Sequence, residues 1–393
     1  MIPRTKVNYS LLDLARSCFA RSGRHEFTGR LTDRLSELFG TRNVLLTASG
    51  RGALYLLLRA LPQSAVVVPA YTCKAVVEAV KLAGKEVVYV EAEPDGFNMD
   101  PSALAPLVGE DAIVLATHQF GIPCSIEAIV RLCEERGAFL IEDAAASMGS
   151  RVGTRLTGTF GDAAFFSFDS TKLLTVPLKG GFLTAKDAVV FERVRQVHSQ
   201  EVRPMPWWTH LKLLFFATAL VLLEKHLVYR IFHTVVFRWR NRFTADSTQL
   251  DLRLNALYRY RLAEWQGWLA ERQLDRFDEI IRARRRIYAE YHRRLQGSKT
   301  FVLPPEDRSQ EWACIRFPIR ISSDKLSFYR SAVKRGVDFA FSFTFIVSPQ
   351  RFELAHRLAA SVLDLPFYYK LSESELDTVV SVLLQLDEEG VSQ

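Results

Sequence analysis

The chain has 393 residues, of which 48% are apolar and 24% are charged, a balance that is typical of an ordered globular protein. Its net charge of +7 is concentrated between Arg203 and Phe243, where seven Lys/Arg accompany a single acid, Glu224. The rest of the chain is nearly neutral. Because this basic charge lies beside a long apolar run, it points to a phospholipid surface rather than to nucleic acid as a partner.

Five cysteines are scattered along the chain without a Cys-x-x-Cys pair, which indicates neither a disulfide framework nor a metal site. Near the N-terminus, Asp13 and Arg16 interrupt the apolar run from Leu11 to Ala20, so we expect no signal peptide. The simplest expectation is a cytoplasmic protein without a metal ion.

Between residues 44 and 185, short β-branched runs alternate with helical patterns, which predicts successive βα units around a buried, mostly parallel sheet. The predicted strands are Val66–Val68, Val87–Val90, Ile113–Ala116, Phe139–Ile141, Ala164–Ser167 and Phe182–Thr184. Helices are expected to begin near Gly50 and to run from Ser125 to Glu135. Such sheets bind ligands beyond the carboxyl ends of their strands, so the functional residues should follow these strands.

Later segments predict an insertion and a second domain. Residues 207–240 form a separate unit, and residues 262–295 have the pattern of one long, charged helix. The chain closes with a predicted helix over 372–386 in a small α/β domain. We therefore predict a large domain over 1–255, with an insertion at 203–250, and a linking helix with a small domain over 256–393.

The first candidate motif runs from Ser49 to Leu54, where small residues open a predicted helix. Small side chains at Gly50 and Gly52 let the backbone come close to a ligand, and the N–H groups of a helix N-terminus suit a phosphate. The alternative is an ordinary glycine turn with a helix cap.

The second motif places carboxylates at the end of a strand, at Glu142 and Asp143. An aspartate held there can keep a pyridine nitrogen protonated, which turns the ring into an electron sink. The alternative is that Glu142 or Asp143 caps the next helix.

The third motif is the run from Gly161 to Phe168, followed by Lys172. A lysine that lies just past a buried strand among apolar side chains loses its proton more easily and can attack an aldehyde. The alternative is a solvated surface lysine, and Lys179 and Lys186 are competing candidates for the same role.

The fourth motif combines Tyr71 and Cys73 with His118 on the next strand end. Flat or polarisable side chains at these positions are suited to stacking on a cofactor ring. Alternatively, they are loop and core residues.

The order and spacing of these segments resemble the DegT/StrS family of pyridoxal-phosphate (PLP)-dependent sugar aminotransferases, over nearly the whole chain outside 203–250. The family's Ser-Gly-Thr with Ala-Leu resembles 49–54, and its Glu-Asp-Ala-Ala resembles 142–145. Its Gly-Asp-Ala with Phe-Ser-Phe and a lysine resembles 161–172. The helix that links the family's domains resembles 273–284.

The resemblance implies the α/β fold of fold type I PLP transferases, with a mostly parallel seven-stranded sheet in a large domain plus a smaller C-terminal α/β domain. It implies a homodimer with shared active sites, in which Lys172 is bound to PLP and Asp143 contacts the pyridinium nitrogen. Ser167 and the turn from Ser49 to Arg51, with Gly50 between them, are the implied phosphate contacts.

The implied reaction moves an amino group, often from glutamate, to a keto-sugar carried on a nucleotide, with Lys172 moving the proton. Family members that act as dehydratases carry histidine at the lysine position, so Lys172 argues against that branch. The leading interpretation is therefore an aminotransferase that acts on a nucleotide- or lipid-linked keto-sugar in polysaccharide or aminosugar biosynthesis. The alternatives are an altered or inactive family member acting as a membrane-associated binding or regulatory protein, and a PLP enzyme with a different reaction.

Four positions depart from the family's pattern. Arg51 replaces the common threonine, and Arg259 stands where an asparagine that reaches the partner's PLP phosphate is expected; both guanidinium groups are suited to phosphate. Ala146 replaces a glutamine or histidine beside the ring, and Cys73 occupies a position that is usually aromatic. Tyr71 is our substitute candidate for stacking on the ring.

The insertion carries a tryptophan pair, Trp207 and Trp208, a largely apolar stretch over 213–223 and a basic edge that includes Arg238, Arg240 and Arg242. The stretch is too short to cross a bilayer, which takes ~20 residues. Our hypothesis is an interfacial hairpin on the inner leaflet, with 207–240 as a peripheral membrane contact. The alternative is a helical pair buried at the dimer interface or against the core.

Overall fold

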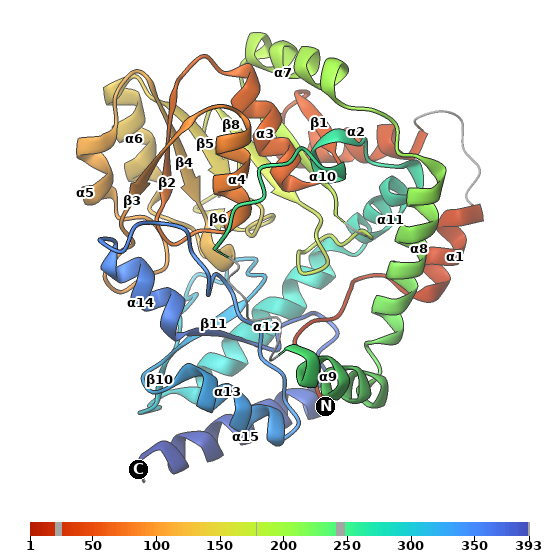
Figure 1. The fold of residues 1–393 in the computed structure, drawn as a ribbon, viewed down its shortest axis with the longest axis vertical. Helices are drawn as coiled ribbons and strands as arrows, with labels where there is room; N and C mark the ends of the chain where they lie inside the picture. Colours follow the sequence, from red (N-terminus) through yellow and green to blue (C-terminus); the bar gives the residue numbers. More distant parts are fainter. Residues whose placement is uncertain (20–25, 178, 241–247, 392–393) are drawn as a thin grey trace.

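The computed structural model describes residues 1–19, 26–177, 179–240 and 248–391. Within these ranges, a seven-stranded sheet has the order β1-β9-β8-β5-β4-β2-β3 (Figure 1). Its strands are β1 (Val44–Thr47), β2 (Ala65–Pro69), β3 (Glu86–Val90), β4 (Ala112–Thr117), β5 (Phe139–Asp143), β8 (Ala163–Ser167) and β9 (Gly181–Ala185). Neighbouring strands are parallel except that β9 runs antiparallel to β1 and β8. The predicted mostly parallel sheet is confirmed.

Helices cover both faces of this sheet. The helices of this part of the chain are α1 (Leu11–Phe19), α2 (Glu26–Phe39), α3 (Gly50–Ala60), α4 (Lys74–Leu82), α5 (Pro101–Leu104), α6 (Ile126–Arg136), α7 (Ala188–Glu201) and α10 (Ala256–Arg259). A small β-hairpin pairs β6 (Arg151–Val152) with β7 (Arg155–Leu156). Val66 and Val68 of β2 pack with α3 and α4, whereas Val67 packs with α5 and α6. Successive side chains of a strand point to opposite faces, so a strand covered on both faces needs an unbroken apolar run.

The C-terminal part is built on a three-stranded antiparallel sheet, in the order β10-β11-β12. Its elements are α12 (Phe277–Leu295), β10 (Phe301–Val302), β11 (Phe317–Ile321), α13 (Lys325–Lys334), α14 (Glu353–Ser361), β12 (Val362–Leu365) and α15 (Glu373–Val391). The N-terminus also joins this unit, because Ile2 pairs with Val337, although the prediction placed it with the large domain.

The linking helix predicted over 262–295 is two helices, α11 (Glu264–Leu274) and α12, and the single-helix prediction is wrong in this respect. The break lies at Arg276, whose φ of −114° and ψ of 16° are not helical. Just before it, Gln273 is tied to the backbone of Thr175 by two hydrogen bonds of 2.8 Å, and Arg276 donates to the carbonyl of Asn8. These tertiary contacts hold the junction between α11 and α12.

The insertion folds as a helical hairpin of α8 (Trp207–Leu222) and α9 (His226–Arg240). In Figure 1, α8 lies beside α1, and α9 lies near the N-terminus and the small sheet. In the described part of the chain, the helices are all too short or too polar to span a bilayer. Arg242, the last residue of the predicted basic edge, lies outside the described residues.

Candidate active site

Residues from separate parts of the sequence meet in a cavity at the carboxyl ends of the parallel strands. Asp143 is the last residue of β5, Ser167 is the last residue of β8, and Lys172 lies in the loop that follows β8. The cavity has a volume of about 150 Å³, and its wall includes the predicted residues Ser49, Gly50, Arg51, Cys73, Asp143, Ser167 and Lys172. This is the place at which doubly wound sheets bind their ligands.

Asp143 and Lys172 influence each other's charge inside this cavity. Burial lowers the pKa of Lys172 below its ordinary value, and the nearby carboxylates of Asp143 and Asp169 oppose that shift. Burial raises the pKa of Asp143, and the charge of Lys172 again opposes the shift. A buried carboxylate and a half-buried amine thus lie at one site with pKa values shifted in opposite directions, an arrangement typical of reaction centres.

The loop that carries Lys172 is fixed from several sides. Leu173 and Leu174 are fully buried beneath it. Asn8 donates from its side chain to the carbonyl of Leu173 at 2.6 Å, and its backbone N–H donates to the hydroxyl of Thr175 at 2.9 Å. The N-terminal segment therefore contributes to the site by positioning the loop, a role for which the sequence pattern gave no signal.

The two competing lysines have other partners. Lys179 also lies on the cavity wall, where it forms an ion pair with Asp169. Lys186 donates to the carbonyl of Phe160 at 2.8 Å, away from the cavity. Lys172 is thus the lysine that faces Asp143 without an ion pair among the described residues.

The neighbouring acids Glu142 and Asp143 have different roles because they point to opposite faces of β5. Glu142 is fully buried and accepts backbone N–H groups of Gly158, Phe160 and Gly161 at 2.8, 2.6 and 2.8 Å. These contacts fix the turn that leads into β8. Asp143 accepts the N–H of Ala145 at 3.1 Å, and a turn rather than a helix follows it, so the helix-cap alternative does not hold.

The N-terminus of α3 forms the end of the cavity that suits a phosphate. Ser49 caps the helix by accepting the N–H of Gly52 at 3.0 Å, while its hydroxyl donates to the carbonyl of Leu257 at 2.6 Å. A Cβ atom at Gly50 would lie 3.0 Å from the Cβ of Ser167, so glycine allows α3 to pack closely on β8. The guanidinium of Arg51 reaches Glu78 at 3.4 Å beside the same helix end.

Tyr71, His118 and Arg259 are not on the wall of this cavity, and the predicted ring contacts of Tyr71 and His118 are not supported. Tyr71 is fully buried and packs edge-to-face on Phe343, because it faces the junction with the C-terminal part. His118 accepts the N–H of Cys124 on Nδ1, and its Nε2 donates to Glu142 at 3.0 Å.

Arg259 is exposed at the end of α10, outside the cavity of its own chain. Its expected contact was with the phosphate in the partner subunit, so this assignment stays a prediction.

Sequence reasoning missed the wall residues Asp169 and Phe343, whereas Gln119, next to His118 in the fourth motif, does lie on the wall. Gln119 donates to the carbonyl of Tyr71 and so joins the ends of β4 and β2. Phe343 comes from the C-terminal part with a left-handed φ of 49°, and a sequence pattern carries no signal for such a position. Asp169 could have been found, because it lies three residues before Lys172 in the same loop.

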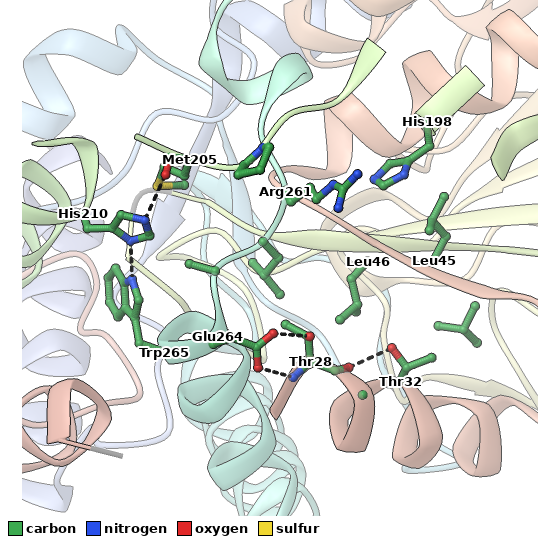
Figure 2. A pocket seen from close by; sticks show the side chains of 15 residues that line it. Thr28, Thr32, Leu45, Leu46, His198, Met205, His210, Arg261, Glu264 and Trp265 are labelled. Carbon is green, nitrogen blue, oxygen red and sulfur yellow. Dashed lines mark hydrogen bonds between the residues drawn. The ribbon is translucent and has the colours of Figure 1, made fainter. Parts of the chain in front are cut away.

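A larger cavity of about 770 Å³ lies between α2, β1, α11 and the segment before α8 (Figure 2). Some of its polar side chains bond to each other, since Glu264 accepts from Thr28 and Trp265 donates to His210 at 2.9 Å. The buried Nε2 of His198 on the same wall has no hydrogen-bond partner among the described residues. Its wall contains no lysine in the described residues. We therefore place the chemistry in the smaller cavity.

The smaller cavity fits PLP, the cofactor that the resemblance implies. It offers a half-buried amine at Lys172 for the aldehyde, a buried carboxylate at Asp143 for the pyridine nitrogen, and a helix N-terminus with Ser167 for the phosphate. At the expected stacking position, Cys73 lies on the wall, exposed and without a side-chain hydrogen bond at the start of α4. The ring therefore lacks an aromatic partner at that position.

The chain is similar to curated proteins over part or most of its length. The GDP-perosamine synthase of Caulobacter vibrioides is 24% identical over 369 residues, 88% of this chain and 86% of that protein. The GDP-perosamine synthase of Escherichia coli O157:H7 is 30% identical, but the match covers 44% of this chain and 48% of that protein. For several such relatives, the chain thus matches only about half of their length.

Solved structures show the same fold. The aminotransferase TlmJ from Streptoalloteichus hindustanus is 23% identical, with 100% of each chain covered and a TM-score of 0.77. PseC from Helicobacter pylori, an aminotransferase of pseudoaminic acid biosynthesis, is 16% identical, with 99% of each chain covered and a TM-score of 0.77. The profile of the DegT/DnrJ/EryC1/StrS aminotransferase family matches residues 7–384. The chain therefore belongs to the DegT/DnrJ/EryC1/StrS family of PLP-dependent sugar aminotransferases.

Proposed function

We propose that the chain transfers an amino group from glutamate to a keto-sugar, carried on a nucleotide or a lipid, in polysaccharide or aminosugar biosynthesis. The observation that carries the proposal is that Lys172 and Asp143 lie on the wall of one cavity, beside a helix N-terminus, and influence each other's pKa. The GDP-perosamine synthases among the relatives support a nucleotide-linked sugar as the acceptor class. We also propose that the enzyme is a cytoplasmic homodimer, with 207–240 in contact with the inner face of a membrane.

When bound, PLP supplies an electron sink next to the carbon that carries the amino group. Asp143 would hold the pyridine nitrogen in its protonated form through its negative charge. Lys172, with its pKa lowered by burial, spends more time as the neutral amine that takes up a proton at that carbon and returns it.

The first experiment separates cofactor binding from acceptor choice. Purified protein supplied with PLP should show a visible absorbance band, and addition of glutamate should bleach the band while 2-oxoglutarate forms. Lys172→Ala should lose both signals, whereas Lys186→Ala, a matched lysine variant away from the cavity, should keep them. A colourless protein that ignores PLP would contradict the proposal.

The acceptor is then found by mass spectrometry. Nucleotide-linked and lipid-linked keto-sugars are offered with glutamate, and amination is followed by the change in product mass. The proposal predicts that at least one sugar of these classes is aminated. If glutamate bleaches the band but only amino-acid-derived ketoacids accept the amino group, the enzyme is a PLP transaminase of another substrate class.

A further inference from the structure

The helices α1, α8 and α9 carry an unusual concentration of exposed apolar side chains. Of 21 large apolar side chains that are exposed in the described residues, 14 lie on these three helices. Phe19, Trp207, Phe215 and Leu227 are among the most exposed, at 83, 70, 79 and 71%. In Figure 1, α1 and α8 lie side by side at one edge of the molecule, with α9 directly below. An apolar area of this extent on a folded protein marks a contact surface.

The opposite side of the hairpin is firmly attached to the protein. Ala217 of α8 is buried in the core beside α11. At the turn, Glu224 accepts the N–H of Val7 at 2.7 Å. On α9, His226 contacts Glu375 at 2.7 Å, and Tyr229 donates to Asp338. The exposed apolar face is therefore the outer side of a fixed element, and burial of the whole hairpin against the core, one of the expected alternatives, is wrong.

The charged side chains around this face indicate which class of partner it binds. Arg16, Lys212 and Arg230 are exposed on these three helices, and Lys225 is exposed in the turn between α8 and α9. The acids of the described part of this region are Asp13 on α1 and Glu224 in the turn, and Glu224 forms an ion pair with Lys370 at 3.5 Å. The outer face therefore combines apolar side chains with unbalanced positive charge, which suits the headgroups and acyl boundary of an anionic bilayer.

A second copy of the chain fits this face less well. In a two-fold interface the same patch lies on both partners, so the exposed basic side chains of one copy would lie near those of the other. An anionic lipid surface instead neutralises them. The tryptophan pair at the start of α8 also favours lipid, because tryptophan prefers the boundary between headgroups and acyl chains.

We infer that α1, α8 and α9 together form a docking surface that lies flat in the headgroup region of an anionic membrane. This sharpens the membrane contact of the proposed function by naming the helices and the lipid charge. It does not depend on the reaction, because vesicle binding is measured without any sugar acceptor. Failure of docking and failure of the aminotransferase activity are thus separate results.

The test is sedimentation of the full-length, PLP-loaded protein with vesicles of phosphatidylcholine, with and without phosphatidylglycerol. We expect binding to the anionic vesicles that weakens with added salt. The triple variant Phe215→Ser, Leu227→Ser, Ile231→Ser should bind at least about tenfold more weakly. The control variant Val189→Ser, Leu326→Ser, Leu384→Ser removes three exposed apolar side chains elsewhere and should bind like the wild type.

Two further measurements identify the occupant of the face. Replacing Lys212, Lys225 and Arg230 with glutamine should weaken binding to anionic vesicles on the order of a hundredfold, with little change on neutral vesicles. Brominated lipids should quench the fluorescence of the wild type but much less that of Trp207→Phe, Trp208→Phe. An unchanged visible band and unchanged melting confirm that each variant is folded.

The inference is overturned if the wild type stays in the supernatant with both vesicle types, or if the apolar variant binds as the wild type does. It is also overturned if the apolar variant changes the protein from dimer to monomer in light scattering, because the face would then be a subunit interface.

Discussion

Charged side chains are usually exposed and large apolar side chains are usually buried. The cavity around Lys172 and the outer face of the α8–α9 hairpin depart from this pattern in opposite ways. In the cavity, a carboxylate is buried beside a half-buried amine, whereas on the hairpin bulky apolar side chains such as Phe215 and Leu227 lie in water. Each arrangement costs stability unless something binds there: a cofactor in the first region, a surface in the second. The comparison shows that departures from burial indicate function of two kinds, chemistry inside and contact outside.

The largest expected effect concerns the cavity. Asp143→Asn keeps the size of the side chain but removes the charge that holds the pyridine nitrogen protonated. We expect the rate of glutamate-dependent band bleaching to fall on the order of a thousandfold, while thermal melting changes little. Single-turnover stopped-flow absorbance measures this rate. A variant that reacts as fast as the wild type would remove Asp143 from the chemistry.

Replacing the neighbouring acid, Glu142, should lower the stability of the fold, whereas replacing Asp143 should mainly lower the reaction rate. Glu142→Gln leaves three backbone N–H groups facing one amide oxygen instead of a full carboxylate. We expect a loss of about 3 kcal/mol in the free energy of unfolding. Urea denaturation followed by circular dichroism measures it. If Glu142→Gln were as stable as the wild type, the turn at 158–161 would not depend on this carboxylate.

The pH dependence of PLP attachment tests whether burial in the cavity lowers the pKa of Lys172. Because the pKa of Lys172 is lowered from 10.5, its amine loses the proton at lower pH than a free lysine. The rate at which the apo-protein attaches PLP should therefore rise with pH, and it should reach its plateau at a pH below 10.5. Asp169→Asn should move the midpoint lower still, because the Asp169 carboxylate opposes the shift. A midpoint at or above 10.5 would contradict this.

A smaller effect is expected at the phosphate end. Ser49→Ala removes the cap of α3 and the hydrogen bond to Leu257. The expected loss is about 1 kcal/mol in the free energy of unfolding, together with weaker PLP binding. Calorimetry and PLP titration measure the two quantities. Unchanged stability would show that the cap contributes little here.

The smallest effect on stability is expected on the hairpin. Leu227 is 71% exposed, so Leu227→Ser should change the free energy of unfolding by less than about 0.5 kcal/mol. Urea denaturation measures this change. A loss of 2 kcal/mol, on the scale of a buried leucine, would mean that the outer face is covered in the folded protein.

The sequence allowed prediction of the parts that depend on local pattern. The apolar strands, the helix after Gly50 and the placement of Asp143, Ser167 and Lys172 at strand ends follow from periodicity, and the structure brings these residues together. Residues whose position depends on distant contacts were missed or misplaced. Tyr71 turns toward the C-terminal part and Phe343 enters the cavity from it, because packing between the two sheets decides their direction.

The helix break at Arg276 has the same cause, since it depends on bonds from Gln273 to Thr175 and from Arg276 to Asn8. The sequence also left open whether the hairpin lies on the surface. A run of apolar side chains looks alike in a core and on a membrane-facing helix, and only the exposed fraction separates the two.

The assignment of Lys172 as the residue that binds PLP is tested most directly by chemical trapping of the cofactor on its lysine. The PLP-loaded protein is reduced with borohydride, digested, and searched by mass spectrometry for a pyridoxyl-modified peptide. We expect one modified site, on the peptide that contains Lys172. Modification of Lys179 or Lys186 in its place, or of surface lysines without preference, would contradict it.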